Sequence, residues 1–463
     1  MIAPLFLGFF GLRSMVRLLR FLAAGGGIGA SILAADVRVG AAAVDLQADD
    51  TMVIGGSILP RFAKGQEGKL RAVAIVVQDT QGRRVAIVAC DVLMLNRDYL
   101  DPAATEIEKR TGIPASHVLI NCTHTHSAPT TCTVHGYKRE EGFCRQVQTA
   151  VVEAVIQADT NARRSPPAQL MFHLAQEKTV GQNSRLRLAD GRIRWTGAAT
   201  EADAPPTGPF DPDLPVMGFR RSDGTVAAML FGHSTHNMGT LATNVRSPAF
   251  YGMAAQDIER QLGAVTLFLQ GASGSTHNLS LKPAQAEQTV RTAVLDAWKA
   301  AAALPAKRVG SIKREVTVTV RRFNEAKEEE AVTSYCRKYI PGPRAEETIQ
   351  VFRNMRQQLA GLQGQKRKTW VHAMQIGDVA IVGVPAEYFT VLGLDIKKRS
   401  PFRHTIIAEL ANDWVGYIGD KPAYALGGYQ LWMGLHSWTE VGTGELVADE
   451  AVKLLKELHA DGR

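Results

Sequence analysis

The chain has 463 residues, of which 45% are hydrophobic and 21% are charged, which is typical of a soluble globular protein with one large or two ordinary domains. The net charge of +8 is spread along the chain without a run of basic residues. The sequence therefore predicts no nucleic-acid partner, although peripheral contact with an anionic membrane surface is compatible with this charge. Five cysteines without a Cys-x-x-Cys pair argue against a disulfide framework and against a Cys-only zinc site.

The N-terminus predicts an export signal. Arg17 and Arg20 provide positive charge, residues 21–33 are largely apolar, and Ala34-Ala35 offers small residues for cleavage. We therefore expect a signal peptide at residues 1–35 and a folded domain at 36–463 that works in the periplasm or outside the cell. An uncleaved anchor is the alternative, although the apolar stretch is short and glycine-rich for a membrane span.

Strand-like and helix-like segments alternate along the rest of the chain. Two β-branched runs at 71–77 and 84–90 flank Thr80-Gln81-Gly82 and predict a hairpin, and further turns are predicted at 189–191 and 222–224. Helices are predicted over residues 98–110, 142–158, 251–262, 284–302, 326–339, 345–362 and 448–459. The alternation predicts an α/β fold with a mixed β-sheet core, flanking helices and an active site at strand ends. The charged helices within 325–365 indicate a helical insertion or lid.

Polar residues follow four apolar strand-like runs. If the strand at 117–120 continues, His124 and His126 point to the same face, because strand side chains alternate. The other three runs lead to His233 and His236, to a Gly/Ser turn with Ser275 and His277, and to Glu387. Because open α/β sheets place ligands at strand ends, the pattern indicates one site, with unrelated turn and capping residues as the alternative. The amides of the Gly/Ser turn are expected to be free to hold an anion or oxyanion.

These motifs, in this order, resemble the neutral/alkaline ceramidase family. The resemblance runs from about Val39 to about Tyr429 and rests on Thr-His-Thr-His-Ser at 123–127, the strand ending at His233, the Gly/Ser turn, Pro-Ala-Glu at 385–387 and Asn-Asp-Trp-Val-Gly-Tyr at 412–417. It implies a zinc-dependent hydrolase that cleaves the amide of an N-acylsphingosine-like lipid or a related molecule. The family's C-terminal immunoglobulin-like domain is expected to be absent, because little chain follows Tyr429.

The resemblance also implies roles for single residues. His124, His233 and Glu387 match the zinc ligands, and Tyr417 matches a tyrosine that contacts the metal. The residues expected to act on the substrate are His126, Tyr429, Arg185 and, by the loosest match, Ser275. Two histidines and a glutamate are also the ligand set of catalytic zinc, which makes hydroxide available near neutral pH. Asp91, directly after a strand, is expected either to orient a ligand histidine or to cap a turn.

The chain departs from the family in the Gly/Ser turn. Gly-Ser-Thr-His-Asn at 274–278 replaces the family's Gly-Asp-x-Ser-Pro-Asn, so a substrate other than ceramide, either another amide or an ester, stays open. Two other functions also stay open. One is a serine esterase or amidase that uses Ser275 and His277, without the usual Gly-x-Ser-x-Gly elbow. The other is a secreted, non-catalytic binding protein with a retained zinc site.

Overall fold

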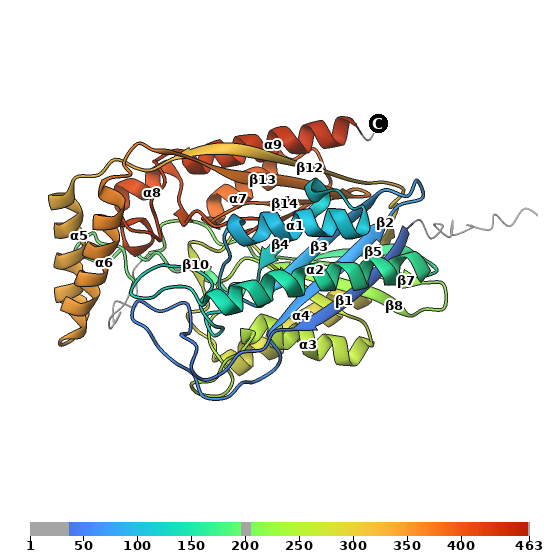
Figure 1. Cartoon of the computed structure of the whole chain (residues 1–463), viewed down its shortest axis with the longest axis horizontal. Helices are drawn as coiled ribbons and strands as arrows, with labels where there is room; N and C mark the ends of the chain where they lie inside the picture. Colours follow the sequence, from blue (N-terminus) through green and yellow to red (C-terminus); the bar gives the residue numbers. More distant parts are fainter. Residues whose placement is uncertain (1–36, 196–204, 462–463) are drawn as a thin grey trace, which may run out of the picture. The chain divides into compact units, whose positions relative to one another are not determined.

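The computed structural model describes residues 37–195 and 205–461, so the predicted signal peptide at 1–35 lies outside the described residues. In these two ranges the chain folds around two β-sheets that are flanked by helices (Figure 1). None of the helices in the two ranges has the length and apolar character needed to cross a membrane.

The larger sheet has nine strands in the order β4-β3-β2-β1-β5-β7-β8-β9, with β11 paired to β5. Its strands are β1 (Val37–Asp45), β2 (Arg71–Gln78), β3 (Arg84–Cys90), β4 (Val118–Cys122), β5 (Pro167–Gln176), β7 (Asp213–Arg221), β8 (Val226–His233), β9 (Thr266–Gln270) and β11 (Ala302–Leu304). The pairs β3/β4 and β8/β9 are parallel and the other pairs are antiparallel, which confirms the mixed sheet. The predicted hairpin is β2/β3, with Val77 opposite Val85.

The smaller sheet has the order β12-β13-β14-β16, and two short strand pairs lie apart from it. Its strands are β12 (Val309–Thr319), β13 (Lys366–Ile376), β14 (Val379–Gly383) and β16 (His404–Ala408). The short pairs are β6 (Gln182–Asn183) with β10 (Thr276–His277), and β15 (Glu387–Tyr388) with β17 (Tyr417–Ile418). The second short pair joins two residues that the sequence assigned to one site, Glu387 and Tyr417, as direct neighbours in register.

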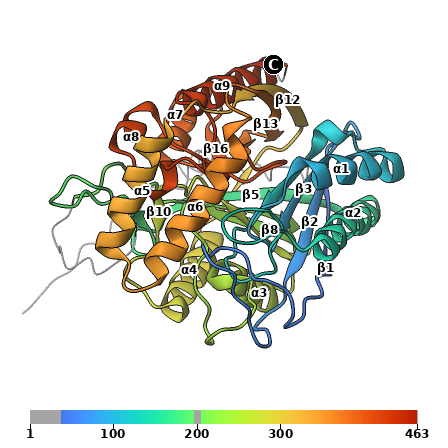
Figure 2. The same ribbon diagram turned by 60° about the vertical axis from the view of Figure 1, so that its left-hand side comes forward.

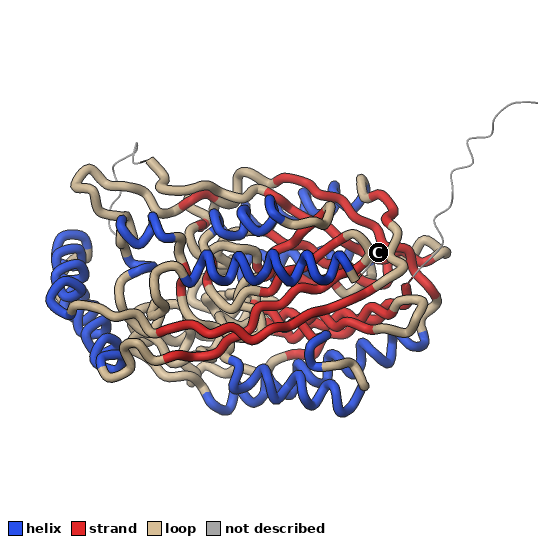
Figure 3. The backbone as a smooth tube through the Cα atoms, turned by 90° about the horizontal axis from the view of Figure 1, so that it is seen from above, coloured by secondary structure: helices blue, strands red, loops and turns tan. Residues whose placement is uncertain are grey.

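The two sheets pack face to face, and helices cover their outer faces (Figures 1 and 3). Ile75 and Ile87 of the larger sheet share one buried cluster with Met374 and Ile381 of the smaller sheet. The covering helices are α1 (Arg97–Thr111), α2 (Glu141–Arg164), α3 (Ala249–Leu262) and α4 (Pro283–Lys299) on the larger sheet, and α7 (Thr390–Arg399) and α9 (Thr443–Ala460) on the smaller one. Alternate residues of each strand are thus buried in two different hydrophobic cores, because successive side chains point to opposite faces of the sheet.

The helices expected between residues 325 and 365 are α5 (Glu325–Tyr339) and α6 (Arg344–Ala360), which lie side by side (Figure 2). Their buried Tyr335 and Phe352 belong to the same hydrophobic cluster as Trp432 and Val134, so the pair is packed into the body of the protein. The remaining helical segments are α8 (Lys421–Leu426), η1 (Ala115–His117) and η2 (Tyr429–Leu431).

The predicted helices all form, with shifted ends. Helix α1 stops where expected, because Gly112 adopts a left-handed conformation (φ 74°) and its amide closes the last turn. Helix α4 ends at Lys299, earlier than expected, because the chain enters β11 at Ala302 and pairs with β5. A strand partner that is distant in sequence decides that boundary.

Candidate metal centre and active site

The candidate site lies where strands of both sheets end. His124 and His126 follow β4, His236 follows β8, and Glu387 begins β15 shortly after β14. The Nε2 atoms of His124 and His126 are 3.2 Å apart, and ring nitrogens of His124, His126 and His236 all lie within 4.8 Å of one another. The Oε2 atom of Glu387 lies 3.4 Å from Nε2 of His124 and 3.5 Å from Nε2 of His236.

Backbone carbonyls fix the protonation of all three imidazoles. The Nδ1 of His124 donates to the Leu93 carbonyl (3.0 Å), that of His126 to the Gly56 carbonyl (3.0 Å) and that of His236 to the Ser273 carbonyl (2.8 Å). A carbonyl oxygen can only accept, so each Nδ1 carries the proton. In the neutral imidazoles each Nε2 is then a bare lone pair. The lone pair of His126 faces that of His124, and those of His124 and His236 face the Glu387 carboxylate.

This donor set fits a divalent cation. Lone pairs that converge on a carboxylate repel unless a positive charge lies between them, and imidazole ligands of zinc commonly donate their other ring nitrogen to a carbonyl or carboxylate. Tetrahedral zinc with bonds of ~2.0–2.1 Å holds its ligand atoms roughly 3.3–3.4 Å apart. The distances from Glu387 to His124 and His236 agree with that spacing.

Burial and charge act in opposite directions on Glu387. Burial would raise the pKa of its carboxyl, but the adjacent His124 and His236 hold it well below its usual value. Burial would likewise lower the pKa of His124, but the Glu387 carboxylate raises it. The other oxygen of Glu387 accepts a hydrogen bond from Trp414 Nε1 (3.2 Å), so the carboxylate keeps one oxygen for the histidine cluster.

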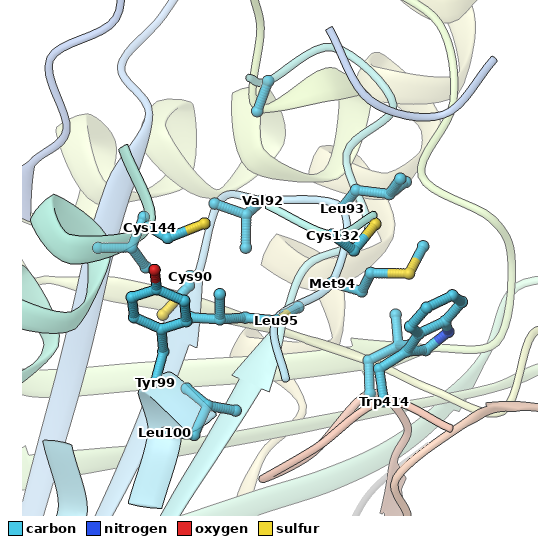
Figure 4. Packing of buried hydrophobic residues seen from close by; sticks show 14 of the residues in the cluster. Cys90, Val92, Leu93, Met94, Leu95, Tyr99, Leu100, Cys132, Cys144 and Trp414 are labelled. Carbon is cyan, nitrogen blue, oxygen red and sulfur yellow. The ribbon is translucent and has the colours of Figure 1, made fainter. Parts of the chain in front are cut away.

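Hydrophobic packing supports the site from behind. Leu93, Met94, Cys132 and Trp414 gather beyond the ends of β3 and β4 (Figure 4). Leu93 supplies the carbonyl that holds His124, and Trp414 supplies the indole that holds Glu387. Both orienting groups therefore come from buried residues of one core cluster.

Of three comparisons with known proteins, the one with solved structures found matches. No family model matches the chain, and the search of curated proteins found no match. Among solved structures, a ceramidase complexed with C2 matches 92% of this chain and 76% of its own chain, with a TM-score of 0.69 and 17% identity. The neutral ceramidase from Pseudomonas aeruginosa matches 92% of this chain and 75% of its own, with a TM-score of 0.68 and 19% identity.

The chain has the neutral ceramidase fold. The family resemblance of the sequence is therefore confirmed at the level of architecture, over most of the chain. Identities this low leave the residues of the site to be argued from their own geometry.

Within this ceramidase fold, the expected position of His233 is wrong. Its Nε2 donates to the Glu177 carbonyl (3.2 Å), and its Nδ1 accepts from the Tyr251 hydroxyl. His233 follows Met229 and Phe231 on the face of β8 that packs under α3, so strand alternation turns it away from the site. His236, three residues further on, takes the place beside His124 and Glu387.

The strand that was expected to carry both histidines of the β4 loop ends early. Strand β4 stops at Cys122, and His124 adopts a left-handed backbone conformation (φ 60°). The two rings still meet edge to face, with centroids 4.7 Å apart. A turn, and not strand alternation, brings them together.

Two amides of the Gly/Ser turn after β9 are already hydrogen-bonded. Ser273 N donates to Glu409 Oε2 (3.0 Å), and Gly274 N donates to the Tyr388 carbonyl (2.9 Å). A Cβ on Gly274 would lie 2.4 Å from the Glu387 carbonyl oxygen, so glycine is required for this close approach. The turn positions the Glu387 strand, and these two amides are not free to hold an anion as the sequence led us to expect.

Glu409, which the sequence did not single out, links this turn to the Glu387 strand. It is fully buried and accepts from Ser273 and from Tyr388 N (2.7 Å). Burial raises the pKa of its carboxyl to about 8. The signal available in the sequence was a glutamate at the end of an apolar strand, Thr405-Ile406-Ile407-Ala408.

Asp91 lies near the site without touching a histidine ring. Its carboxylate accepts from Arg71 N (3.0 Å) and from Thr123 Oγ1 (3.1 Å), whereas the Nδ1 of His124 is held by Leu93. The expected orientation of a ligand histidine by Asp91 is therefore wrong, and Asp91 satisfies backbone and hydroxyl donors as a turn residue does.

Ser275 and Arg185 lie outside the metal centre. The Ser275 hydroxyl contacts Thr390 Oγ1 (3.2 Å), and Arg185 is buried with its guanidinium on Gln430 Oε1 (2.9 Å) and the Gly427 carbonyl (2.7 Å). Both line a separate cavity of about 80 Å³. Arg185 thus holds the loop before Tyr429, and the structure does not place it or Ser275 on the cavity at the metal centre.

A cavity of about 320 Å³ opens onto the candidate metal centre. Its lining includes His126, Tyr417 and Tyr429, which the sequence assigned to the site, and His277. Tyr417 brings its hydroxyl 3.1 Å from His236 Nε2, at the boundary between cavity and metal centre. The hydroxyl of Tyr429 lies 3.2 Å from Nε2 of His135, another residue that the sequence did not single out.

His277 pairs with a serine other than the one expected. Its Nδ1 lies 2.7 Å from the hydroxyl of Ser184, and its ring stacks on His236 with centroids 3.9 Å apart. Ser184 also lines the cavity. The β6/β10 strand pair creates this contact by placing the two segments side by side.

Proposed function

We propose that this protein is a zinc-dependent hydrolase that cleaves the amide bond of an N-acylated lipid or a related N-acyl compound. The observation that carries the proposal is the set of three imidazoles whose Nδ1 atoms are held by carbonyls, with the Nε2 atoms of His124 and His236 directed at Glu387. Two solved structures with the same fold are described as ceramidases, which supports the choice of an amide substrate.

His124, His236 and Glu387 would hold the ion, and Tyr417 would approach it from the cavity. These three ligands are buried, whereas His126 is half-buried and reaches both the cluster and the cavity. Bound zinc would polarise the amide carbonyl and lower the pKa of a water to about 7.

The chain's own groups then handle the substrate and its protons. The hydroxyl of Tyr417 can donate to the carbonyl oxygen as negative charge develops on it. His126 can accept a proton at Nε2 from water entering through the cavity, since its Nδ1 is fixed on Gly56. The His126 imidazolium formed in this way can then return the same proton to the nitrogen of the leaving amine.

Export and a lipid substrate remain part of the proposal. The predicted signal at residues 1–35 supports a periplasmic or secreted enzyme. Met238 and Leu279, exposed apolar residues that line the cavity, support an acyl-chain substrate met at a lipid surface.

A serine-dependent hydrolase is a second candidate, and the observation that favours it is the 2.7 Å contact between Ser184 and His277. It involves Ser184 instead of Ser275, whose hydroxyl is bonded to Thr390. Among the described residues no carboxylate is hydrogen-bonded to His277, and a triad base normally has such a partner. A binding protein without turnover is the third candidate.

Chelation separates the three candidates. The zinc hydrolase releases amine from a short-chain N-acylsphingosine or a simple N-acyl amide, stops after chelation and recovers with Zn²⁺. A Ser184-dependent enzyme keeps its activity in chelator and loses it in Ser184→Ala. A binding protein releases no amine in either condition.

A further inference from the structure

The cavity at the metal centre carries positive charge. Arg194 and Arg344 line it together with His126 and Tyr417, and no aspartate or glutamate occurs among its lining residues in the described ranges. Concave sites lined by charge of one sign concentrate ligands of the opposite sign. The guanidinium group also matches the geometry of carboxylate and phosphate oxygens.

Neither arginine has an acidic partner among the residues that the structure describes. Within residues 37–195 and 205–461, Arg194 and Arg344 form no ion pair, although their neighbours do. On α6, Arg353 pairs with Glu329, and Arg356 pairs with Glu325 at 2.9 Å. Near Arg194, Arg192 pairs with Asp190 at 3.4 Å. Two of the cations without an ion pair in the described ranges therefore lie together on the wall of one cavity.

Apolar groups line the same cavity. Met238 and Leu279 belong to its lining and are 38% and 40% exposed. Trp195 stacks on Tyr429 with centroids 4.3 Å apart and an interplanar angle of 6°. Guanidinium groups together with apolar side chains around one opening suit a ligand with an anionic part and an acyl chain.

We infer that the substrate is an N-acyl amide that carries an anionic group, such as the carboxylate of an N-acyl amino acid or a phosphate or sulfonate, and that Arg194 and Arg344 bind this group. The inference rests on the proposed amide hydrolysis and narrows its substrate class. N-Acylsphingosine has no anionic group, so the cavity selects against it relative to an anionic amide of equal chain length.

Binding tests the inference apart from turnover. Affinities of the full chain for N-octanoylglycine, N-octanoyltaurine and the neutral N-octanoylglycinamide are measured by calorimetry, before and after chelation. We expect both anions to bind at least about tenfold more tightly than the neutral amide. The preference should persist after chelation, because the arginines remain in place when the metal is removed. A preference that came only from coordination of the metal by the carboxylate would be lost.

Charge-neutral variants assign the effect. Arg194→Met and Arg344→Met should each reduce the anion preference several-fold, and the double variant should abolish it. Arg187→Met is the matched control, because Arg187 is exposed on the segment before Arg194 and does not line the cavity. Equal affinity for charged and neutral amides, or a preference that survives the double variant, overturns the inference.

Turnover of the same three amides separates this inference from the proposed function. Anion preference in binding without amine release from any amide contradicts the proposed hydrolysis and leaves the anion site standing. Zinc-dependent release from the neutral amide at the same kcat/KM as from the anions contradicts the anion site and leaves the hydrolase standing.

Discussion

The His236 imidazole and the Glu387 carboxylate face each other at 3.5 Å, and they lie in segments that follow strands of different sheets. His236 follows β8 of the larger sheet, and Glu387 follows β14 of the smaller one. The donor set therefore exists only when the two sheets are packed against each other. Metal binding and the packing of the sheets should be thermodynamically linked.

The first prediction concerns metal removal. A ligand that binds only the folded state stabilises it by about 2.7 kcal/mol at a concentration of 100 Kd. We expect the chelated protein to melt several degrees lower and to regain its melting temperature with Zn²⁺, in a thermal-shift titration. The His124→Ala variant is the control, and a zinc-dependent shift that persists in it would contradict the assignment of the site.

The second prediction compares His233, the last residue of β8, with His236, three residues further on. His236→Ala should lose bound zinc and amide hydrolysis. His233→Ala should keep its zinc but lose about 1–3 kcal/mol of stability, because Tyr251 and the Glu177 carbonyl are left without a partner in the interior. Metal content by mass spectrometry, together with chemical unfolding, checks both, and zinc loss in His233→Ala with zinc retained in His236→Ala would reverse the assignment.

These two histidines also show which parts of the site could be predicted from the sequence. Apolar runs followed by polar residues located the site loops correctly, because short continuous apolar runs are typical of buried strands. The choice between His233 and His236 depended on strand register, and the alternation with Met229 and Phe231 already placed His233 under α3. The hydrogen-bond partners of Glu409 and the Ser184–His277 contact were not predictable, because these contacts join segments that meet only in the folded chain.

The third prediction concerns Tyr417. Removing one donor to a developing oxyanion typically lowers kcat by about 10²–10³. We expect Tyr417→Phe to lower kcat by this order while the thermal stability changes little. Tyr339→Phe, which removes a hydroxyl bonded to Asp190 outside the site, should retain full activity. An unchanged kcat in Tyr417→Phe would rule out this donor role.

The fourth prediction concerns pH and Asp91. Burial raises the pKa of Asp91 to about 7 in the folded protein, whereas an unfolded aspartate titrates near 3.9. Between these values the folded state binds more protons, so the Asp91 contribution to stability falls as pH rises from about 4 to 7 and then levels off. In Asp91→Asn this fall should disappear, so the unfolding free energy of the wild type relative to the variant decreases from pH 5 to 7.

The control for this pH dependence is Asp190→Asn. Hydrogen bonding from Lys338 lowers the pKa of Asp190 to about 2, so this carboxyl is ionised in both states above pH 5. The difference in unfolding free energy between the wild type and Asp190→Asn should therefore stay constant between pH 5 and 7. Zinc affinity should be unchanged in Asp91→Asn, since Asp91 touches no ligand ring; a loss of affinity would restore an orienting role.

The backbone of His124 has a consequence for engineering. A left-handed conformation is unfavourable for most L-residues by about 1–2 kcal/mol and is relieved by glycine or asparagine. Directed evolution that rewards heat resistance alone, in a zinc-poor medium, should therefore enrich Gly or Asn at position 124 and discard the site. Libraries built on this scaffold need a selection for turnover at every round, because here the most robust variants and the most active ones diverge at a single codon.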